Sequence, residues 1–385
     1  MSGMKILQIH SFMKSESLAP AAGGMARAAL QLTKLLAAAG HEVRVLPIPE
    51  GMGSRVLWEL APGRTIEVSP AMDFPAGADL RWLPFALSRI KPKSRGLRAL
   101  YYDACALTAL RRAVGSFRPD IIHNHLAREP FPRLAQGLGL TKPLILTHHH
   151  YELGERLMAY DRIIFPSGSS MDQMIHEGGY PREKARKVSC PVQPVFTRER
   201  RFTRKKRVGI FFVGMIRLRK GIDLLLDAYR QDKRLWAEPL HICGYGPDHA
   251  LIEEAVSQDG LPIIDEGMCT PEQLVEKLDG ARLVVIPSRM ESLCIALLEA
   301  LCCGVPVVGW GPTVREVEQT LSLKAGIPFD GRTQSARELA DSIHLALASG
   351  FSRSENRQAL AEAARQAFSE DSFLKGNLEV YRELV

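Results

Sequence analysis

Two carboxylates of this chain, Glu291 and Glu299, stand on either side of a predicted helix start. The apolar run 281–286 predicts a buried strand, residues 287–291 its exit loop, and residues 295–303 a helix. At such a helix start the first main-chain N–H groups lack a helical partner, and the helix dipole makes them attractive to an anion. Carboxylates before and after a phosphate seat suit two hydroxyl-bearing groups, so the segment predicts a nucleotide-sugar site. The amides concerned belong to Ser292, Leu293, Cys294 and Ile295.

A second interpretation treats both carboxylates as ordinary helix residues. Glu291 would then be a first-turn acid favoured by the helix dipole, and Glu299 a solvated residue on the helix face. However, Glu299 stands between Leu298 and Ala300 in an otherwise apolar helix, where an unpaired buried carboxylate is costly. We therefore favour the functional interpretation.

The segment from Pro287 to Val308 resembles the sugar-nucleotide signature of the family 4 retaining glycosyltransferases, P-S-x-x-E-S-F-G-x-x-x-x-E-A-x-x-x-G-x-P-V-V. In that family the first Glu contacts hydroxyls of the donor sugar and the second holds the ribose, so the resemblance assigns these roles to Glu291 and Glu299. It also implies the α/β fold called GT-B, with two Rossmann-like domains whose parallel sheets face a central cleft. Cys294 departs from the family's glycine, and its side chain is expected to narrow the site.

Length and pattern together predict a two-domain chain. A length of 385 residues exceeds one comfortable core, and strand and helix patterns alternate through both halves. We predict an acceptor-binding Rossmann-like domain over residues 1–196 and a nucleotide-sugar-binding Rossmann-like domain over 197–370. Residues 371–385 predict a helix, which by the family resemblance packs back on the N-terminal domain.

The predicted N-terminal domain carries a glycine pair, Gly23 and Gly24, just before its first helix. Paired glycines there free the backbone to approach an anion or a sugar, although many such pairs are simple turns. The pair resembles the family's G-G loop, which lies against the donor diphosphate and the acceptor. We therefore expect Gly24 on the donor side and Gly23 on the acceptor side.

Histidines end two further predicted strands of the same domain. The segment 142–150 matches the family's T-x-H motif, whose histidine lies by the transferred sugar, and the match selects His149 as a catalytic residue. His148 and His150 are competing assignments. His123 and His125 end the other strand; we place them on the acceptor side, with a structural role as the alternative.

The stretch 213–223 resembles the family's G-R-L-x-x-x-K-G loop, whose Arg and Lys clamp the leaving diphosphate. Lys220 matches the lysine, but Met215 replaces the arginine. Arg217 or Arg219 is expected to supply the missing charge, and the sequence leaves the choice between them open.

Two glycine turns complete the predicted donor site. Gly244 and Gly246 match the family's G-x-G-P turn near the nucleotide, and Gly267 with Met268 occupies the usual place of main-chain contacts with the base. Each turn alone is equally compatible with a plain strand end. The chain has no Asp-x-Asp triplet, so we expect neither a metal ion nor a cofactor, and the donor is a nucleoside-diphosphate sugar.

The net charge of +7 is unevenly placed, since residues 81–118 hold nine basic side chains and one acid. Aromatic and aliphatic residues interleave these charges, a mixture that suits the headgroups of an anionic membrane, with a solvated basic helix as the alternative. No nucleic-acid-binding signature accompanies the charge. We expect a cytoplasmic protein, with peripheral binding to the inner face of the membrane as a further possibility.

The leading hypothesis is a retaining, metal-independent hexosyltransferase that uses a hydroxyl acceptor, with a lipid-linked or cell-envelope glycan precursor as the acceptor class considered. Loss of the arginine at Met215 and of the glycine at Cys294 motivates a rival, a non-catalytic relative or partner subunit that binds sugar nucleotides. A sugar-nucleotide epimerase on the same scaffold is a third interpretation. The retained residues favour transfer over both; they are His149, Lys220, Glu291 and Glu299.

Overall fold

The structure is a computed structural model that describes residues 3–10, 24–47, 56–61, 64–68, 110–125, 141–149, 155–199, 207–351 and 354–385. The chain forms two compact units. The first unit consists of Met1–Pro166, Ser170–Val188 and Leu374–Val385, and the second of Ser167–Ser169 and Ser189–Phe373. The sequence-based boundaries at residues 196 and 370 stay predictions.

The first unit is built on an eight-stranded sheet of order β3-β4-β2-β1-β5-β6-β7-β8. Its neighbouring strands run parallel, as the sequence predicts, except for β3 and β4, which pair antiparallel at one edge. The central strands β5 and β6 are buried along their whole length, as parallel strands covered on both faces must be. The strands are β1 Lys5–His10, β2 Glu42–Pro47, β3 Val56–Ala61, β4 Arg64–Val68, β5 Ile121–Asn124, β6 Leu144–Thr147, β7 Arg162–Phe165 and β8 Ala185–Lys187.

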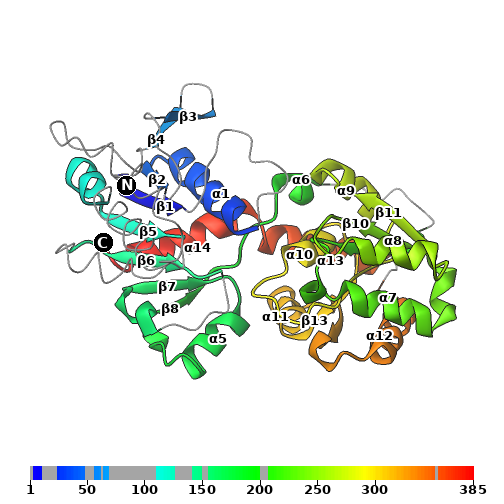
Figure 1. Ribbon diagram of the computed structural model, residues 1–385. Helices are drawn as coiled ribbons and strands as arrows, with labels where there is room; N and C mark the ends of the chain where they lie inside the picture. Colours follow the sequence, from blue (N-terminus) through cyan, green and yellow to red (C-terminus); the bar gives the residue numbers. More distant parts are fainter. Residues whose placement is uncertain are drawn as a thin grey trace, which may run out of the picture. The chain divides into compact units, whose positions relative to one another are not determined.

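The second unit holds a six-stranded sheet of order β11-β10-β9-β12-β13-β14, in which every pairing is parallel. Successive strands are separated by helices, which is the arrangement expected of a Rossmann-like domain (Figure 1). The strands are β9 Ile210–Val213, β10 Leu240–Cys243, β11 Ile263–Gly267, β12 Leu283–Ile286, β13 Val307–Trp310 and β14 Gly326–Phe329.

The helices of both units follow the predicted alternation. In the first unit α1 covers Gly24–Ala38 and α5 covers Gly168–His176, with the two residues that begin α5 assigned to the second unit. Those of the second unit are α6 Pro194–Thr197, α7 Ile222–Gln231, α8 Ala250–Ser257, α9 Pro271–Asp279, α10 Ile295–Cys302, α11 Gly311–Leu321, α12 Ala336–Ala348 and α13 Ser354–Ala367, with the short 3-10 helix η3 at Leu218–Lys220.

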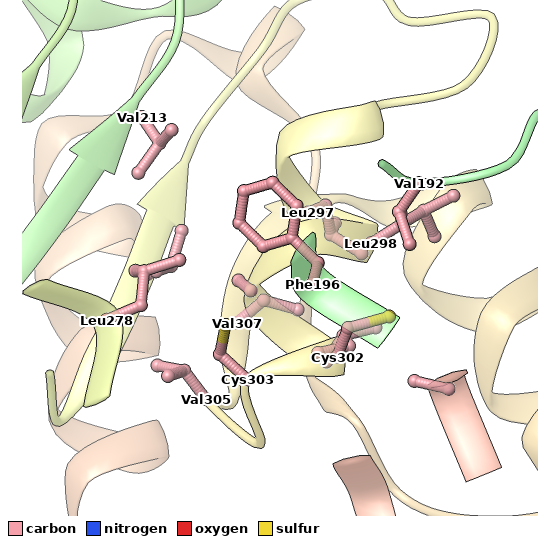
Figure 2. Packing of buried hydrophobic residues seen from close by; sticks show 14 of the residues in the cluster. Val192, Phe196, Val213, Leu278, Leu297, Leu298, Cys302, Cys303, Val305 and Val307 are labelled. Carbon is pink, nitrogen blue, oxygen red and sulfur yellow. The ribbon is translucent and has the colours of Figure 1, made fainter. Parts of the chain in front are cut away.

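Hydrophobic side chains cover both faces of the second sheet. Alternate residues of β9 point to opposite faces, with Ile210 and Phe212 in one buried cluster and Phe211 and Val213 in the other. The second of these clusters contains α10, and Figure 2 shows Phe196 of α6 lying beside this helix. Residues 297–302 of α10 are all buried, so this part of the helix is enclosed on all sides. Figure 2 labels Leu297, Leu298, Cys302 and Cys303 around Phe196.

The last helix, α14 (Glu370–Arg382), carries the end of the chain back to the strands of the first unit (Figure 1). Glu383 accepts hydrogen bonds from Arg162 of β7 at 2.8 Å and from Arg186 of β8 at 2.7 Å. The hydrogen bond from Arg186, and to a smaller extent that from Arg162, lowers the pKa of Glu383. The ion pairs therefore fasten the end of the chain to β7 and β8.

Within the described residues, every helix falls short of the length and apolarity needed to span a bilayer. The basic segment 81–118 lies mostly outside the described residues, which begin again at Leu110. Its membrane role stays a prediction.

Candidate functional site

The centre of the candidate site is an ion pair between the half-buried Lys220 and the buried Glu291. Lys220 ends η3 after β9, and its Nζ lies 2.5 Å from Oε1 of Glu291, in the loop after β12. The Ser288 hydroxyl donates to the same oxygen at 2.6 Å. β9 and β12 are adjacent parallel strands, so their carboxyl ends meet at one sheet edge and bring the two loops together.

The surroundings of Lys220 keep its amine charged. Burial is the largest influence and favours the neutral amine, but the pKa is raised because the Cys294 sulfur and the hydrogen-bonded Glu291 carboxylate favour the ammonium. Burial raises the pKa of the Cys294 thiol to about 12, so at neutral pH this group carries no charge. The carboxylate is therefore the partner that holds the ammonium under working conditions.

Helix α10 begins directly after this ion pair. Its N-cap residue is Cys294, while Ser292, Leu293 and Ile295 are half-buried around the helix start. The Cys294 side chain is 2% exposed and belongs to the hydrophobic core, and its φ of −81° is ordinary for a residue with a side chain. The thiol is therefore packed into the protein, beside the phosphate seat predicted at the helix start.

Glu299 is the fifth residue of α10 and is only 7% exposed. Its negative charge is among the influences that raise the pKa of Cys294, after burial and the charge of Glu291. The Cys294 thiol thus lies within electrostatic reach of both carboxylates that the sequence singles out. The interpretation of Glu299 as a solvated face residue is wrong, because its side chain is buried.

The loop after β9 places its three relevant side chains differently. Met215 is 47% exposed, and Arg217 and Arg219 are also exposed. Nη1 of Arg219 donates to the Met290 carbonyl at 3.2 Å, whereas the Arg217 guanidinium forms no hydrogen bond or ion pair with the part of the chain that the structure describes. The structure thus distinguishes the two candidates for the missing phosphate-clamp cation. The Arg219 guanidinium is bonded to a main-chain carbonyl, and the Arg217 guanidinium is available to a ligand.

The predicted glycine turns lie at the same edge of the sheet. A side chain at Gly244 would collide with the Gly214 carbonyl oxygen, so the close approach of these two loops requires glycine. The N–H of Gly244 donates to the Gly267 carbonyl at 2.8 Å, which links the turns after β10 and β11. Gly246 lies in the same turn as Gly244. Met268 directly follows β11 and is 55% exposed. Four predicted donor residues therefore lie at the carboxyl ends of the neighbouring strands β10 and β11.

Sequence reasoning missed two arginines that support α10 from its far end. Arg357 of α13 is 1% exposed and donates to the Cys303 carbonyl at 3.0 Å and to the Asp279 carbonyl at 3.1 Å. Arg365, eight residues later in α13, donates to the Cys302 carbonyl at 2.9 Å. Positive charge at the C-terminus of a helix stabilises its dipole, and here it also satisfies the last carbonyls. An arginine pair at eight-residue spacing on an otherwise alanine-rich helix is the signal that could have revealed them.

A second missed group braces the loop before Glu291. The guanidinium of Arg289 binds Asp223 of α7 through two hydrogen bonds of 2.9 and 2.7 Å and also donates to the Leu218 carbonyl. Gly221 has φ of +75° and lies against the Pro287 carbonyl, where a Cβ atom would collide. These contacts fix the loops that carry Lys220 and Glu291 relative to each other.

In the first unit, the predicted histidines lie at the carboxyl ends of β5 and β6. His123 is fully buried and bonds to the hydroxyls of Tyr381 at 2.6 Å and of Thr147 at 2.7 Å. Its ring lies 4.2 Å from that of His125, which in turn lies 6.3 Å from the ring of His149. The three histidines therefore form one cluster.

The structure also distinguishes between the competing histidines of the T-x-H segment. His148 is 1% exposed and packs against Phe165, whereas His149 is half-buried on the opposite side of the chain, near His125. His149 is thus the more accessible of the two. His150 and Gly23 lie outside the described residues, and Gly24 is the first residue of α1. Among the side chains that the structure describes, there is no cluster of three ligands suited to a metal ion.

Two family models match the chain in succession. The model described as Glycosyltransferase Family 4 matches residues 22–196, and the model described as Glycosyl transferases group 1 matches residues 196–367. Together they cover residues 22–367, which hold most of both units.

Three curated relatives are glycosyltransferases by name. The D-inositol 3-phosphate glycosyltransferase of Geodermatophilus obscurus is 26% identical over 347 residues, covering 78% of this chain and 73% of the relative. The enzyme of the same name from Salinispora arenicola is 34% identical over 199 residues, covering 46% and 41%. The amylovoran biosynthesis glycosyltransferase AmsK of Erwinia amylovora is 25% identical over 184 residues, covering 45% and 44%. The match thus spans less than half the length of the last two relatives.

Solved structures agree with this chain along its whole length. Sucrose-phosphate synthase from Thermosynechococcus elongatus has a TM-score of 0.71 at 18% identity and covers 99% of both chains. HepE from Anabaena in complex with UDP has a TM-score of 0.69 at 15% identity and covers 99% of this chain and 100% of its own. At these identities the likeness establishes the fold, which is GT-B. With both units matched by successive family models on this fold, the chain belongs to the family 4 glycosyltransferases.

Proposed function

We propose that the protein is a retaining glycosyltransferase that moves a hexose from a nucleoside-diphosphate sugar to a hydroxyl acceptor without a metal ion. The observation that carries the proposal is the placement of Lys220, Ser288 and Glu291 together before the N-terminus of α10. A half-buried ammonium beside a helix N-terminus suits a diphosphate, and a buried carboxylate suits sugar hydroxyls. UDP bound to the structural relative HepE supports this choice of donor class.

The hydrogen bonds of Glu291 leave it equipped for a sugar. Its Oε1 accepts from both Lys220 and Ser288, whereas Oε2 receives no hydrogen bond from the residues that the structure describes. One carboxylate oxygen therefore fixes the side chain, and the other is available to a donor hydroxyl. Glu299, further along α10, is proposed to hold the ribose.

In the proposed reaction, the acceptor oxygen bonds to the anomeric carbon on the face from which the diphosphate departs. The bond between that carbon and the diphosphate oxygen breaks, the electron pair leaves with the diphosphate, and the acceptor proton passes to a phosphate oxygen. Lys220 and the N-terminal amides of α10 stabilise the departing charge, while His149 lines the acceptor side of the sugar. The protein thus contributes through electrostatics and positioning.

We propose the acceptor only as a class, a lipid-linked or cell-envelope glycan precursor carrying a hydroxyl group. The support is the basic segment 81–118, whose charge and aromatic content suit an anionic membrane. The names of the relatives differ in the compound that each concerns, D-inositol 3-phosphate in two and amylovoran in the third.

A screen of nucleotide-sugar donors in the presence of a chelator tests the proposal. The donors are glucose, galactose and mannose linked to UDP, GDP or ADP, and the measurements are nucleotide release and thermal shift. We expect one donor to raise the melting temperature and to be hydrolysed slowly, since ligand at 100 times its Kd stabilises by about 2.7 kcal/mol. Stabilisation without any turnover, with or without added metal, would favour the non-catalytic relative. Activity that disappears with the chelator would show that a metal takes part.

Removing the carboxylate of Glu291, in the loop before α10, or that of Glu299, in α10, is expected to lower kcat/KM strongly. Each side chain should offer a charged hydrogen-bond acceptor, so Glu291→Ala and Glu299→Ala should each cost about 1.5 to 3 kcal/mol, roughly ten- to 150-fold. The loss should fall mainly on kcat for Glu291 and mainly on donor affinity for Glu299, as measured by steady-state kinetics and donor titration. Glu253→Ala, on α8 with a side chain 75% exposed, is the matched control. Wild-type kinetics in both variants would rule out the assignment.

The second cation of the phosphate clamp is expected to be Arg217. Because Arg219 is bonded to the Met290 carbonyl and Arg217 is available, Arg217→Met should lower kcat about tenfold or more, the value of a charged hydrogen bond. Arg219→Met should have the smaller effect. Met215 is exposed in the same loop, so Met215→Arg should partly restore turnover to the Arg217→Met variant. The reverse ranking of the two arginines would transfer the role to Arg219.

A further inference from the structure

A buried hydrogen-bonded chain links the terminal helix to the histidines of the first unit. Gln8 of β1 donates from Nε2 to the Tyr381 hydroxyl at 3.3 Å and accepts at Oε1 from Nε2 of His125 at 2.5 Å. The Tyr381 hydroxyl lies 2.6 Å from Nδ1 of His123, whose Nε2 lies 2.7 Å from Oγ1 of Thr147. All five residues are at most 5% exposed, so these bonds replace contact with water.

The amide of Gln8 sets the direction of every proton in this chain. A phenol has one proton, and the Tyr381 hydroxyl contacts only Gln8 and Nδ1 of His123 among the described residues. Because Gln8 donates to this hydroxyl, Nδ1 of His123 is the acceptor left for the phenol proton. With Nδ1 as an acceptor, the neutral ring carries its proton on Nε2 and donates it to Thr147. Burial, the largest influence, raises the pKa of Tyr381, so the phenol remains a donor throughout the working pH range.

Both ring nitrogens of His123 are therefore occupied by structural partners. The ring is not available to take a proton from an acceptor, and its bond to Thr147 instead fixes the carboxyl end of β6. Residue His149 follows Thr147 by two positions in the same segment. Tyr381, in the last helix, is thus connected through His123 and Thr147 to the segment of His149, the residue proposed to line the acceptor side of the sugar.

We propose that Tyr381 is a positioning residue for the acceptor side: it holds His123 neutral with the proton on Nε2 and, through Thr147, sets the position of His149. The inference rests on the proposed transfer reaction for its kinetic consequence only. The protonation pattern itself is a property of the folded protein. It also gives the docking of α14, fastened by Glu383, a role in turnover.

Histidine-selective nitrogen NMR tests the protonation pattern without any substrate. The His123 signal, identified by its loss in His123→Gln, should show a proton on Nε2 in the native sequence. Gln8→Glu replaces the amide donor with an acceptor of the same shape, so Tyr381 should turn its proton towards residue 8 and His123 should move its proton to Nδ1. A proton on Nδ1 in the native protein, or an unchanged pattern in Gln8→Glu, would overturn the proposal.

Kinetics test the positioning role. Tyr381→Phe should lower kcat roughly 10- to 100-fold, the size of effect expected for slight misplacement of a reacting group, and should leave the donor KM unchanged. The matched control is Tyr180→Phe, since Tyr180 is equally buried in the same unit but its hydroxyl bonds to the Tyr160 carbonyl at 3.4 Å. An equal loss of kcat in both variants, or no loss in Tyr381→Phe, contradicts the proposal. If the native protein transfers no sugar, the proposed function fails, and the NMR result alone decides the protonation pattern.

Discussion

Lys220→Met is expected to lower kcat/KM for sugar transfer by about 10²- to 10³-fold, the loss typical of removing one preorganised group that stabilises developing charge. Methionine retains much of the length and apolar volume of lysine but removes the ammonium that faces the α10 N-terminus. Measurement of nucleotide release, together with a melting curve of each protein, separates lost chemistry from lost folding.

The variant Lys324→Met provides the matched control for this effect. Lys324 forms an ion pair with Glu318 at 3.0 Å, but its side chain is 77% exposed and it follows α11 rather than η3. Its replacement should leave turnover near the native value, because exposed ion pairs contribute little. Equal kinetics for Lys220→Met and the native protein would remove the phosphate-clamp assignment and strengthen the case for a non-catalytic relative.

Arg357→Met is expected to lower the free energy of unfolding of the second unit by about 3 kcal/mol or more. The substitution leaves buried carbonyls of Cys303 and Asp279 without their donor, and each such orphaned group costs about 1 to 3 kcal/mol. The loss is moderated because burial itself disfavours the charge: burial is the largest influence that lowers the pKa of Arg357, to about 10. Urea unfolding followed by circular dichroism measures the effect.

Arg337→Met is the control for this stability prediction. Arg337 lies on the exposed side of α12, where surface substitutions usually change stability by less than about 0.5 kcal/mol. If Arg357→Met unfolds at the same urea concentration as this control, the carbonyls at the end of α10 must be satisfied by another route. Capping by α13 would then not be what holds the helix.

The parts of the fold that the sequence predicted well are those set by local pattern. Short apolar runs bounded by turn residues, such as 283–286, indicate buried strands, and the alternation of strands and helices predicted the parallel sheets. The antiparallel pair β3 and β4 was not predicted, because a short edge strand is defined by its partner and its own sequence carries little signal.

The candidate site shows the same division between local and long-range information. The start of α10 and Glu291 could be named from the strand-loop-helix pattern, and Lys220 from the resemblance of its loop to the family motif. Their contact, across 71 positions of the chain, required the structure. Arg357 and Tyr381 could not be found at all, since their partners are main-chain carbonyls and buried side chains far away in sequence.

The discontinuity of the first unit has a consequence for how the protein is made on the ribosome. Domains generally fold as they emerge, with the N-terminal one first. Here the segment Leu374–Val385 belongs to the first unit but is translated after the entire second unit. Until it emerges, Gln8 and His123 lack the Tyr381 hydroxyl, and Arg162 lacks Glu383. The second unit can therefore complete its core first. Until residues 374–385 are made, buried polar groups of the first unit lack these hydrogen-bond partners.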